Sequence, residues 1–220
     1  MPKVGMELIR KNQVINATLE CISESGFEKL TLESVAKKAG VSKGVVSYYF
    51  KGKEDLILQS FRTFFDHYNQ KVAEAFDKKT TSLKLLETMF DIVVFPKTAL
   101  PEPERLENDL KGQDKNKAIN TLPEDQYFSL LIHFYSRMKQ NEKLQEVYQE
   151  VYQLYLDGVI EILKYGIEKK EFKIVNLLPT AYAILALMDG IILYEALGFK
   201  PLGKSEIKKA YKVHIKNLLT

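Results

Sequence analysis

An eight-residue stretch near the carboxyl end, "GFKPLGKS" at 198–205, matches the G-x-x-x-x-G-K-[ST] pattern of nucleotide-binding phosphate loops. In such a loop Lys204 would contact the β- and γ-phosphates, and Ser205 would bind magnesium. A true phosphate loop follows a buried strand, whereas the residues before this stretch have the composition of a long helix. Pro201 also removes a backbone N–H, and the remaining tail is too short for a parallel sheet. Nucleotide hydrolysis is therefore the weaker hypothesis, and a turn between helices is the simpler one.

Other groups that could support catalysis or bind a metal are sparse. The histidines His67, His133 and His214 are far apart and lack the spacing of a metal site. The single cysteine, Cys21, lies on an apolar helix face, as a small core residue would. No nucleophile can be paired with a base. We therefore expect no enzyme activity, no cofactor and no metal.

A basic and aromatic stretch, "LTLESVAKKAGVSKGVVSYYFKGKEDLI" from Leu30 to Ile57, has the pattern of a helix-turn-helix. Gly40 stands where the first helix must end, and glycine adopts positive φ without strain. Thr31 and Ser42 can cap the two helices. The second helix, about Lys43 to Tyr49, would bring its amino-terminal end to the major groove of duplex DNA.

Two sets of side chains in this stretch could contact DNA. Lys43 could reach guanine acceptors or a phosphate, and Val45 could touch a thymine methyl group. The phenols of Tyr48 and Tyr49 could reach phosphate, and Lys53 lies at the next helix start, where backbone amides also favour an anion. The candidates for reading bases are Lys43, Gly44, Val45 and Ser47.

Residues 7–57 resemble the DNA-binding domain of the TetR/AcrR family of regulators. The matching segment is "INATLECISESGFEKLTLESVAKKAGVSKGVVSYYFKGKEDLI", including Gly-Phe after the first helix and the aromatic-Phe-x-x-Lys ending. The resemblance implies a homodimer that binds a palindromic operator and represses transcription until a ligand binds its carboxyl-terminal domain. The start "MPKVGM" and the "SYYF" pattern are similar to the choline-responsive BetI-like branch.

The resemblance also assigns positions in this chain. It places the four base-reading candidates in the recognition helix, although many members have tyrosine where this chain has Ser47, which implies a different operator preference. Its phosphate-contact positions are occupied by Thr31, Ser42, Tyr49 and Lys53. With Tyr48, these residues are the phosphate-contact candidates.

The rest of the chain has helical periodicity without strand alternation, which predicts an all-α fold. We expect a three-helix DNA-binding domain over 1–53 and a helical ligand-binding and dimerisation domain over 54–220. A proline-rich, charged segment over 96–123 is expected to be a loop, with a helical turn near 102–110. The expected helices are 9–25, 32–39, 43–49, 53–76, 82–95, 124–139, 142–169, 178–197 and 205–219.

The carboxyl-terminal part offers a dimer interface and a ligand chamber. The stretch 178–197 is long enough to span a bilayer, but Asp189 and Glu195 inside it favour an interface helix. Packed with 142–169 against a second copy, it would form a four-helix interface. Aromatic faces could hold an apolar or cationic small molecule, with ordinary core packing as the alternative. The pocket candidates are Tyr127, Phe128, His133, Phe134, Tyr148, Tyr152 and Tyr155.

The composition fits this interpretation. The 220 residues are 45% hydrophobic and 28% charged, with a net charge of +3 and one cysteine, which excludes a disulfide within the chain. The first residues lack an apolar signal-peptide core, so we expect a cytoplasmic protein. Together with the resemblance to TetR/AcrR regulators, which implies this function, these features lead us to expect a ligand-responsive transcriptional repressor that binds operator DNA as a homodimer, with an activator or dual regulator on the same fold as the alternative.

Overall fold

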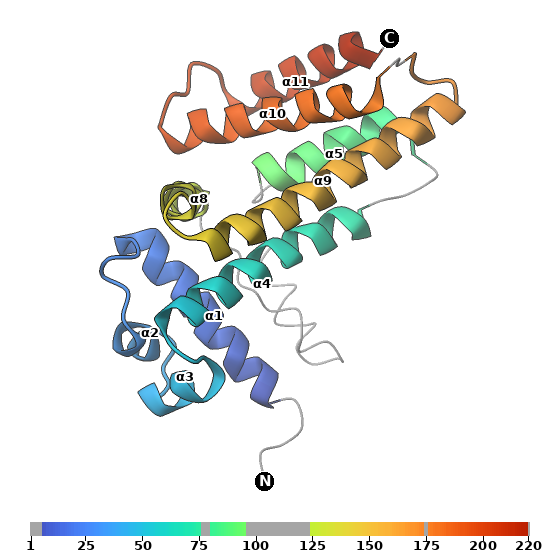
Figure 1. The fold of residues 1–220 in the computed structure, drawn as a ribbon. Helices are drawn as coiled ribbons and strands as arrows, with labels where there is room; N and C mark the ends of the chain where they lie inside the picture. The colour runs from blue at the N-terminus through green and yellow to red at the C-terminus, as the bar shows by residue number, and fades with distance from the viewer. Residues whose placement is uncertain (1–5, 76–79, 96–123, 174–175, 220) are drawn as a thin grey trace. The chain divides into compact units, whose positions relative to one another are not determined.

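The computed structural model describes residues 6–75, 80–95, 124–173 and 176–219, and its regular elements over these ranges are all α-helices (Figure 1). The all-α prediction is therefore confirmed. The predicted loop at 96–123, with its turn at 102–110, lies outside the described residues. The helices are α1 (Met6–Ser25), α2 (Leu32–Lys38), α3 (Lys43–Tyr49), α4 (Lys53–Glu74), α5 (Ser82–Val94), α8 (Glu124–Met138), α9 (Glu142–Glu168), α10 (Leu177–Ala196) and α11 (Lys204–Leu219).

The chain divides into two compact units. Unit 1 is formed by Met1–His67 and Leu100–Val147, and unit 2 by Tyr68–Ala99 and Tyr148–Thr220. The helices α4 and α9 each contribute residues to both units. The division into functional domains 1–53 and 54–220 stays a prediction.

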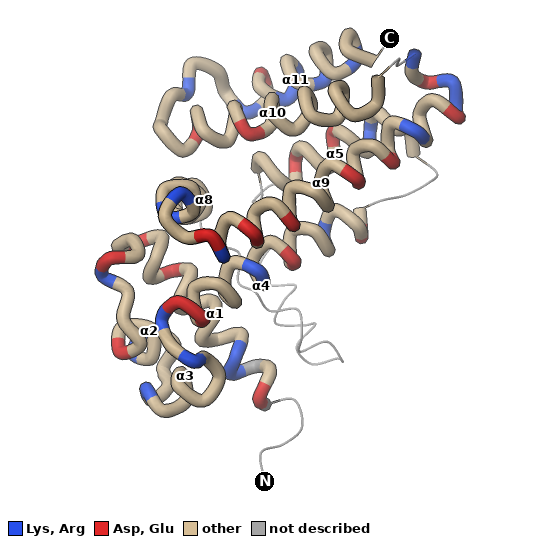
Figure 2. The backbone as a smooth tube through the Cα atoms, in the orientation of Figure 1, with Lys and Arg blue, Asp and Glu red and all other residues tan. Residues whose placement is uncertain are grey.

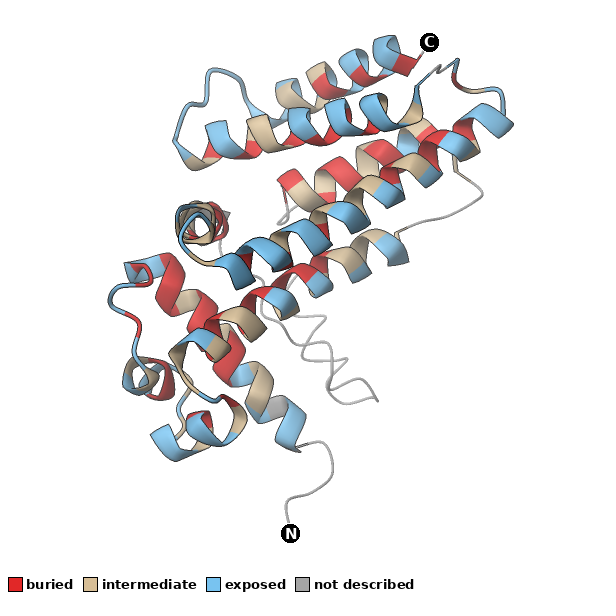
Figure 3. Ribbon diagram, in the orientation of Figure 1, coloured by how far each residue is buried: buried red, intermediate tan, exposed pale blue. Residues whose placement is uncertain are grey.

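Unit 1 is built on the apolar faces of α1 and α4 (Figure 3). Helix α1 packs against α2, α3 and α8, and its buried face includes Val14, Ile15 and Ile22. Phe61 of α4 is fully buried, and its ring stacks on Phe134 of α8 with the ring centroids 4.4 Å apart. Such aromatic pairs contribute about 0.5–1.5 kcal/mol beyond the burial of their surface. The three amino-terminal helices therefore share a core with α4 and α8.

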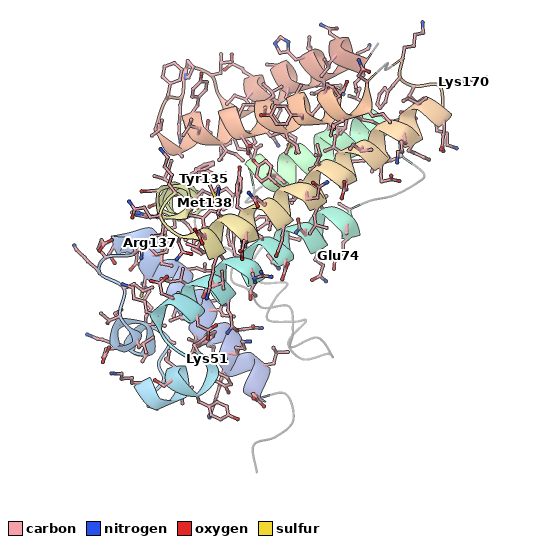
Figure 4. All side chains as sticks on the ribbon, in the orientation of Figure 1. Lys51, Glu74, Tyr135, Arg137, Met138 and Lys170 are labelled. Carbon is pink, nitrogen blue, oxygen red and sulfur yellow. The ribbon has the colours of Figure 1, made fainter. Side chains whose placement is uncertain are left out.

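Polar contacts fix α8 to the amino-terminal helices in unit 1. The hydroxyl of Ser129 donates to the backbone oxygen of Ser23 at the end of α1, over 2.7 Å. Arg137, near the end of α8 (Figure 4), donates to Glu54 at the start of α4 over 3.3 Å. The amide of Asn141 donates to the same carboxylate over 2.9 Å. The end of α1 and the start of α4 are therefore held by α8 and the turn that follows it.

Unit 2 is centred on α5, which packs against α10 and α11. Thr81 caps α5, and its hydroxyl accepts a hydrogen bond from the N–H of Lys84 over 3.3 Å. Leu86 and Phe90 of α5 are fully buried. The ring of Phe90 stacks on Tyr211 of α11 with the centroids 4.0 Å apart. The amphipathic pattern that predicted α5 and α11 thus buries one face of each helix against the other.

The stretch at 198–205 joins two helices. Gly198 has φ +74°, and the N–H of Phe199 donates to the carbonyl of Tyr194 over 2.9 Å, which closes the end of α10. Helix α11 begins at Lys204, so Ser205 lies inside its first turn. A phosphate loop needs a preceding strand, and here α10 precedes the stretch. The nucleotide-hydrolase alternative therefore fails on the fold.

Helix α10 exposes much of its apolar surface. It is long and apolar enough to cross a membrane, alone among the described helices, and 28% of its most apolar 18-residue window is buried within the protomer. Asp189 and Glu195 interrupt it, and Glu195 is buried and paired with Lys200 over 3.3 Å. Uncovered apolar surface of this length indicates a partner surface. The exposed large side chains at this helix are Leu178, Tyr182, Leu187, Leu193, Tyr194 and Leu197.

Candidate functional site

Two caps and one glycine build the turn between α2 and α3. The Thr31 hydroxyl accepts the N–H of Ser34 over 3.0 Å, and the Ser34 hydroxyl accepts the N–H of Thr31 over the same distance. Gly40 has φ +63°, a conformation that side chains make unfavourable. Ser42 caps α3, accepting the N–H of Val45 over 3.4 Å. The helix-turn-helix forms at the predicted position, for the predicted physical reasons.

Helix α3 has one face in the core and one in solvent. Val46 is fully buried, and Phe50, immediately after the helix, is 2% exposed. Tyr48 is 74% exposed, and Val45 is half-buried. An exposed tyrosine is not explained by packing within this chain. The other exposed residues on this helix are Lys43, Gly44 and Ser47.

The amino-terminal end of α3 is both charged and open. The Lys43 ammonium pairs with Glu33 of α2, and the hydrogen bond from Lys43 lowers the pKa of the Glu33 carboxyl. Both groups are exposed, so the pair is weak and can be exchanged for another anion. A methyl group placed at Gly44 would meet nothing closer than the Ser42 hydroxyl, at 3.7 Å. A backbone at Gly44 can therefore come close to a duplex.

The phosphate-contact candidates have structural contacts of their own. The Lys53 ammonium donates to the carbonyl of Phe27 over 2.7 Å, and an ammonium has further donors that a phosphate could use. Tyr49 is half-buried, with its ring edge-on to Tyr48 at a centroid distance of 5.0 Å. Burial raises the pKa of the Tyr49 phenol, so it stays protonated and can donate at neutral pH. Lys51 lies in the loop between α3 and α4, beside these groups in sequence (Figure 4).

The seven aromatic and histidine residues predicted for a ligand pocket fall into two sets. In unit 1, Phe128 and Phe134 are buried, and Tyr127 packs on Phe64 with the ring centroids 6.0 Å apart. His133 lies over Gly26, where an added methyl group would come within 3.0 Å of the imidazole. These four side chains therefore pack against other residues of unit 1. The other three, Tyr148, Tyr152 and Tyr155, follow one another along α9 in unit 2.

A cavity of about 490 Å³ lies in unit 2 between α5, α9 and the carboxyl end of α4. Of the seven predicted residues, Tyr155 alone lines it. The Asn69 side-chain nitrogen is buried and has no hydrogen-bond partner among the described residues. Sequence reasoning missed Asn69 and most of the lining, and the one available signal was Gly158, which leaves room beside a long helix. The other lining residues are Val72, Ala73, Met89, Leu154, Glu161 and Ile162.

A second polar feature of unit 2 joins α9 to α10. The Tyr152 hydroxyl donates to the Asp189 carboxylate, and the rings of Tyr152 and Tyr148 lie 4.3 Å apart. Burial raises the pKa of Asp189 to about 7. The carboxyl group is therefore close to half-protonated at neutral pH. The charge of the Asp189 carboxyl group can therefore change within the physiological pH range.

Comparisons with known proteins find relatives that match the helix-turn-helix segment. The family described as "Bacterial regulatory proteins, tetR family" matches residues 14–59, which contain α2, α3 and the turn between them. The HTH-type transcriptional regulator BetI of Serratia proteamaculans is 43% identical over 72 residues, 33% of this chain and 36% of that protein. The BetI of Escherichia coli K12 is 26% identical over 208 residues, covering 93% of this chain and 91% of the relative.

Solved structures extend the likeness to the whole fold. A TetR transcription regulator from Haloarcula marismortui superposes with a TM-score of 0.72 at 15% identity, covering 96% of each chain. A transcriptional regulator from Saccharomonospora viridis, crystallised in complex with choline, also reaches 0.72 at 15% identity, over 95% of this chain and 96% of that one. At these identities the superpositions establish the architecture of the helices.

Proposed function

Because this chain belongs to the TetR family of transcriptional regulators and has a BetI-like amino-terminal part, we propose that it is a repressor released from its operator by a small molecule. TetR-family regulators bind operator DNA, act as dimers and bind effectors, and this chain is a ligand-responsive regulator of that kind rather than an enzyme. The proposal assigns the DNA contacts to α3 and its flanks, the dimer contacts to α10 and α11, and the effector to the cavity in unit 2. Its place of action is the cytoplasm.

One observation supports the DNA contacts most strongly. Helix α3 places Val46 in the core and leaves Lys43, Gly44 and Ser47 exposed at the end that a recognition helix inserts into the major groove. Thr31, Ser42, Tyr48, Tyr49 and Lys53 then flank that end with hydroxyl and ammonium donors for phosphates. The proposal keeps Lys43, Gly44, Val45 and Ser47 as the base-reading candidates.

Selection of binding sites from random duplex DNA with the full-length protein tests this proposal. Fluorescence anisotropy then compares the selected duplex with a scrambled one. Lys43→Ala is expected to weaken binding to the selected duplex by about tenfold, the usual effect of losing one specific contact. Lys38→Ala is the matched control, because Lys38 of α2 also pairs with a glutamate, Glu24, over 2.5 Å. Equal losses in both variants would contradict the role of α3.

The dimer proposal rests on the uncovered apolar face of α10. Val213 and Leu218 of α11 are also exposed large apolar side chains. A twofold pairing of α10 and α11 would bury these side chains in a four-helix interface and supply the two recognition helices that a palindrome needs. Leu193→Glu should convert the dimer to a monomer of 25.3 kDa in light scattering, whereas Leu8→Glu on α1 should not. If the Leu193→Glu variant stayed dimeric, the dimer interface would have to lie elsewhere on the protein.

The cavity in unit 2 is suited to a small, mainly apolar effector. Its volume of about 490 Å³ lies in the usual range for small-molecule sites, and most of its lining is aliphatic or aromatic. The buried Asn69 nitrogen needs an acceptor, which a carbonyl or ether oxygen of the effector would provide. Occupation of the cavity would tilt α4. This helix begins at Lys53, directly after the helix-turn-helix, and its carboxyl end lines the cavity.

Filling the cavity from within tests the effector proposal. A methyl group at Gly158 would meet nothing within 4 Å, so Gly158→Leu has room to project into the cavity. We expect it to weaken binding of the apolar dye Nile red by about tenfold or more while leaving operator affinity unchanged. Gly158→Ala is the control, since it improves helix propensity without filling the space. Unchanged dye binding in Gly158→Leu would place the effector elsewhere.

A cationic effector is the second candidate, favoured by the Tyr148, Tyr152 and Asp189 cluster. Neighbouring phenol rings and an ionised carboxylate attract a quaternary ammonium group. Because the pKa of Asp189 is about 7, choline binding at this cluster should strengthen as the pH rises from 6 to 8.

A reporter gene placed behind the selected operator distinguishes repression from activation. Deletion of a repressor should raise expression of the reporter, and deletion of an activator should lower it.

A further inference from the structure

A second cavity in unit 2, of about 440 Å³, lies between α5 and α11 and is lined by charged residues. Helix α11 supplies Lys204, Lys208 and Lys212, which follow one another at intervals of four residues and so share one face. Helix α5 supplies Lys84, and Lys209 completes a set of five lysines. Figure 2 shows the concentration of basic residues along α11. Neither the DNA contacts nor the apolar cavity involves these residues.

The positive charge exceeds the negative charge within this site. Asp91 pairs with Lys208 over 2.9 Å, and Glu87 pairs with Lys212 over 2.8 Å. Lys84 approaches the same Glu87 carboxylate, at 3.6 Å. The lining thus contains five lysines and two carboxylates, and three of the lysines, Lys84, Lys208 and Lys212, pair with those carboxylates. Each ammonium carries three N–H donors, so the paired carboxylates hold these three side chains in place while leaving donors for a further anion.

An independent observation comes from Tyr211, which lines this cavity. Its side chain is 2% exposed and its ring stacks on Phe90, yet its hydroxyl has no hydrogen-bond partner in the part of the chain that the structure describes. Burial, and then the nearby carboxylates of Glu87 and Asp91, raise the pKa of the phenol. It is thus a protonated donor at neutral pH. A buried donor without a partner is unfavourable, and a ligand acceptor would satisfy it.

The first turn of α11 also contributes to this charged cavity. The N–H of Gly203 donates to the Glu206 carboxylate over 2.8 Å, which fixes the start of the helix. Lys204 and Ser205, both in the cavity lining, lie at this amino-terminal end, where the helix dipole favours an anion and the Glu206 carboxylate already accepts from one backbone donor. From Lys204 to Lys212 the helix advances about 12 Å, so the lysines match an extended anion rather than a single carboxylate.

We propose that the groove between α5 and α11 binds the phosphate chain of a small phosphorylated molecule, such as a nucleoside di- or triphosphate. Lys204, Lys208 and Lys212 contact the phosphate oxygens, and the Tyr211 hydroxyl donates to the innermost one. The proposed role is binding and not hydrolysis, because helix α10 precedes the 198–205 stretch where a phosphate loop requires a strand. It gives the regulator an input that is separate from the apolar cavity.

Lysine footprinting on the full-length protein tests the proposal directly. The protein is acetylated with a water-soluble ester in the presence of ATP, pyrophosphate, inorganic phosphate or sodium chloride at equal ionic strength, and each lysine is followed by mass spectrometry. ATP and pyrophosphate should slow acetylation of Lys204, Lys208 and Lys212 about fivefold or more, and inorganic phosphate less. Lys164 should not change. Protection equal to that in sodium chloride would overturn the proposal.

Matched variants separate this site from other basic surfaces. Lys212 and Lys164 are each about half-exposed and each pair with a glutamate over 2.8 Å, so Lys164→Gln controls for loss of an ion pair. In calorimetry, Lys212→Gln should weaken ATP binding about tenfold, and Tyr211→Phe, which keeps the ring, about threefold. Lys164→Gln and Lys43→Gln should have no effect.

The pattern of losses decides the outcome. A loss in Lys43→Gln with none in Lys212→Gln would place the anion on the DNA-binding face and refute the groove. Equal losses in Lys164→Gln and Lys212→Gln would show non-specific charge attraction and refute it as well. Operator binding by the same preparations, measured by anisotropy, reports on the DNA-binding function independently, so either function can fail without the other.

Discussion

The helix-turn-helix and the apolar cavity of unit 2 are specified by the sequence in different ways. The first depends on neighbours in the chain: Thr31 and Ser42 cap the helices that follow them, and Gly40 ends the helix before it. The cavity is assembled from α4, α5 and α9, and two of its lining residues, Asn69 and Gly158, are 89 positions apart in the sequence. Local chemistry determines the first, and the packing of distant helices determines the second.

This contrast explains why exposure carries the functional signal in one region and cavity shape in the other. In α3, Tyr48 and Lys43 are exposed because the core of the module is complete without them. In unit 2, the cavity has open space beside Gly158, where an added methyl group would meet no atom within 4 Å. Substitutions should therefore separate stability from binding cleanly in the helix-turn-helix, and less cleanly around the cavity.

The largest expected effect compares a core aromatic with an exposed one in the helix-turn-helix. Phe50→Ala removes a buried side chain and should lower the free energy of unfolding by about 3–5 kcal/mol. Tyr48→Ala should lower it by less than about 0.5 kcal/mol, because the side chain is 74% exposed. Urea denaturation followed by circular dichroism measures both. A large loss of stability in Tyr48→Ala would mean that its role is structural.

A smaller effect contrasts two aspartates, one in each unit. Burial raises the pKa of Asp189 to about 7, so in the folded state it keeps its proton where the unfolded chain, with a value near 3.8, has lost it. This group therefore reduces stability as the pH rises from about 4 to about 7. Asp189→Asn should raise the free energy of unfolding by about 2–4 kcal/mol at pH 8, and by almost nothing at pH 4.

Asp55 in unit 1 should behave in the opposite way. Burial would raise the pKa of its carboxyl, but hydrogen bonds from Gln59, over 2.9 Å, and from the N–H of Lys51, over 2.8 Å, outweigh burial and lower it. The ionised form is favoured in the folded state, so its contribution is present above about pH 4 and is lost as the pH falls. Asp55→Asn should therefore destabilise the protein at pH 7 and not at pH 3. Thermal melts of both variants across pH test the pair, and equal signs would contradict the contrast.

The smallest expected effect compares two threonine caps. Thr31→Ala and Thr81→Ala each remove a hydroxyl that accepts from a backbone N–H, over 3.0 Å at Ser34 and 3.3 Å at Lys84. Each should cost about 1 kcal/mol of stability. Only Thr31→Ala should also weaken operator binding, because Thr31 is proposed to contact a phosphate. Equal operator affinities in the two variants would show that Thr31 acts only as a helix cap and does not contact DNA.

The sequence predicted the helices closely, since caps, glycines and apolar periodicity are local signals. The ends differ by a few residues: α4 ends at Glu74 rather than 76, and α11 begins at Lys204 rather than 205. Fraying and cap geometry decide such ends. The DNA-contact residues could be proposed from the sequence because a recognition helix has fixed positions relative to its turn.

The cavity could not be predicted in the same way. Phe134 and Tyr155 have similar aromatic side chains at helical spacing, but Phe134 stacks on Phe61 in a core while Tyr155 borders open space. Side-chain type does not distinguish these outcomes, because packing between distant helices decides which aromatic groups are covered. Asn69 gave no sequence signal, since an isolated asparagine in a helix is ordinarily a surface residue.

The most direct test of the central claim, that the amino-terminal end of α3 enters DNA grooves twice per dimer, is the salt dependence of binding to the selected operator. For the full-length dimer, the logarithm of the association constant should fall steeply and linearly with the logarithm of salt concentration, with two protomers bound per duplex. Lys53→Gln, which removes a proposed phosphate contact from each protomer, should reduce the slope by about 2. A flat dependence, or a slope unchanged in Lys53→Gln and in Lys43→Gln, would contradict the account.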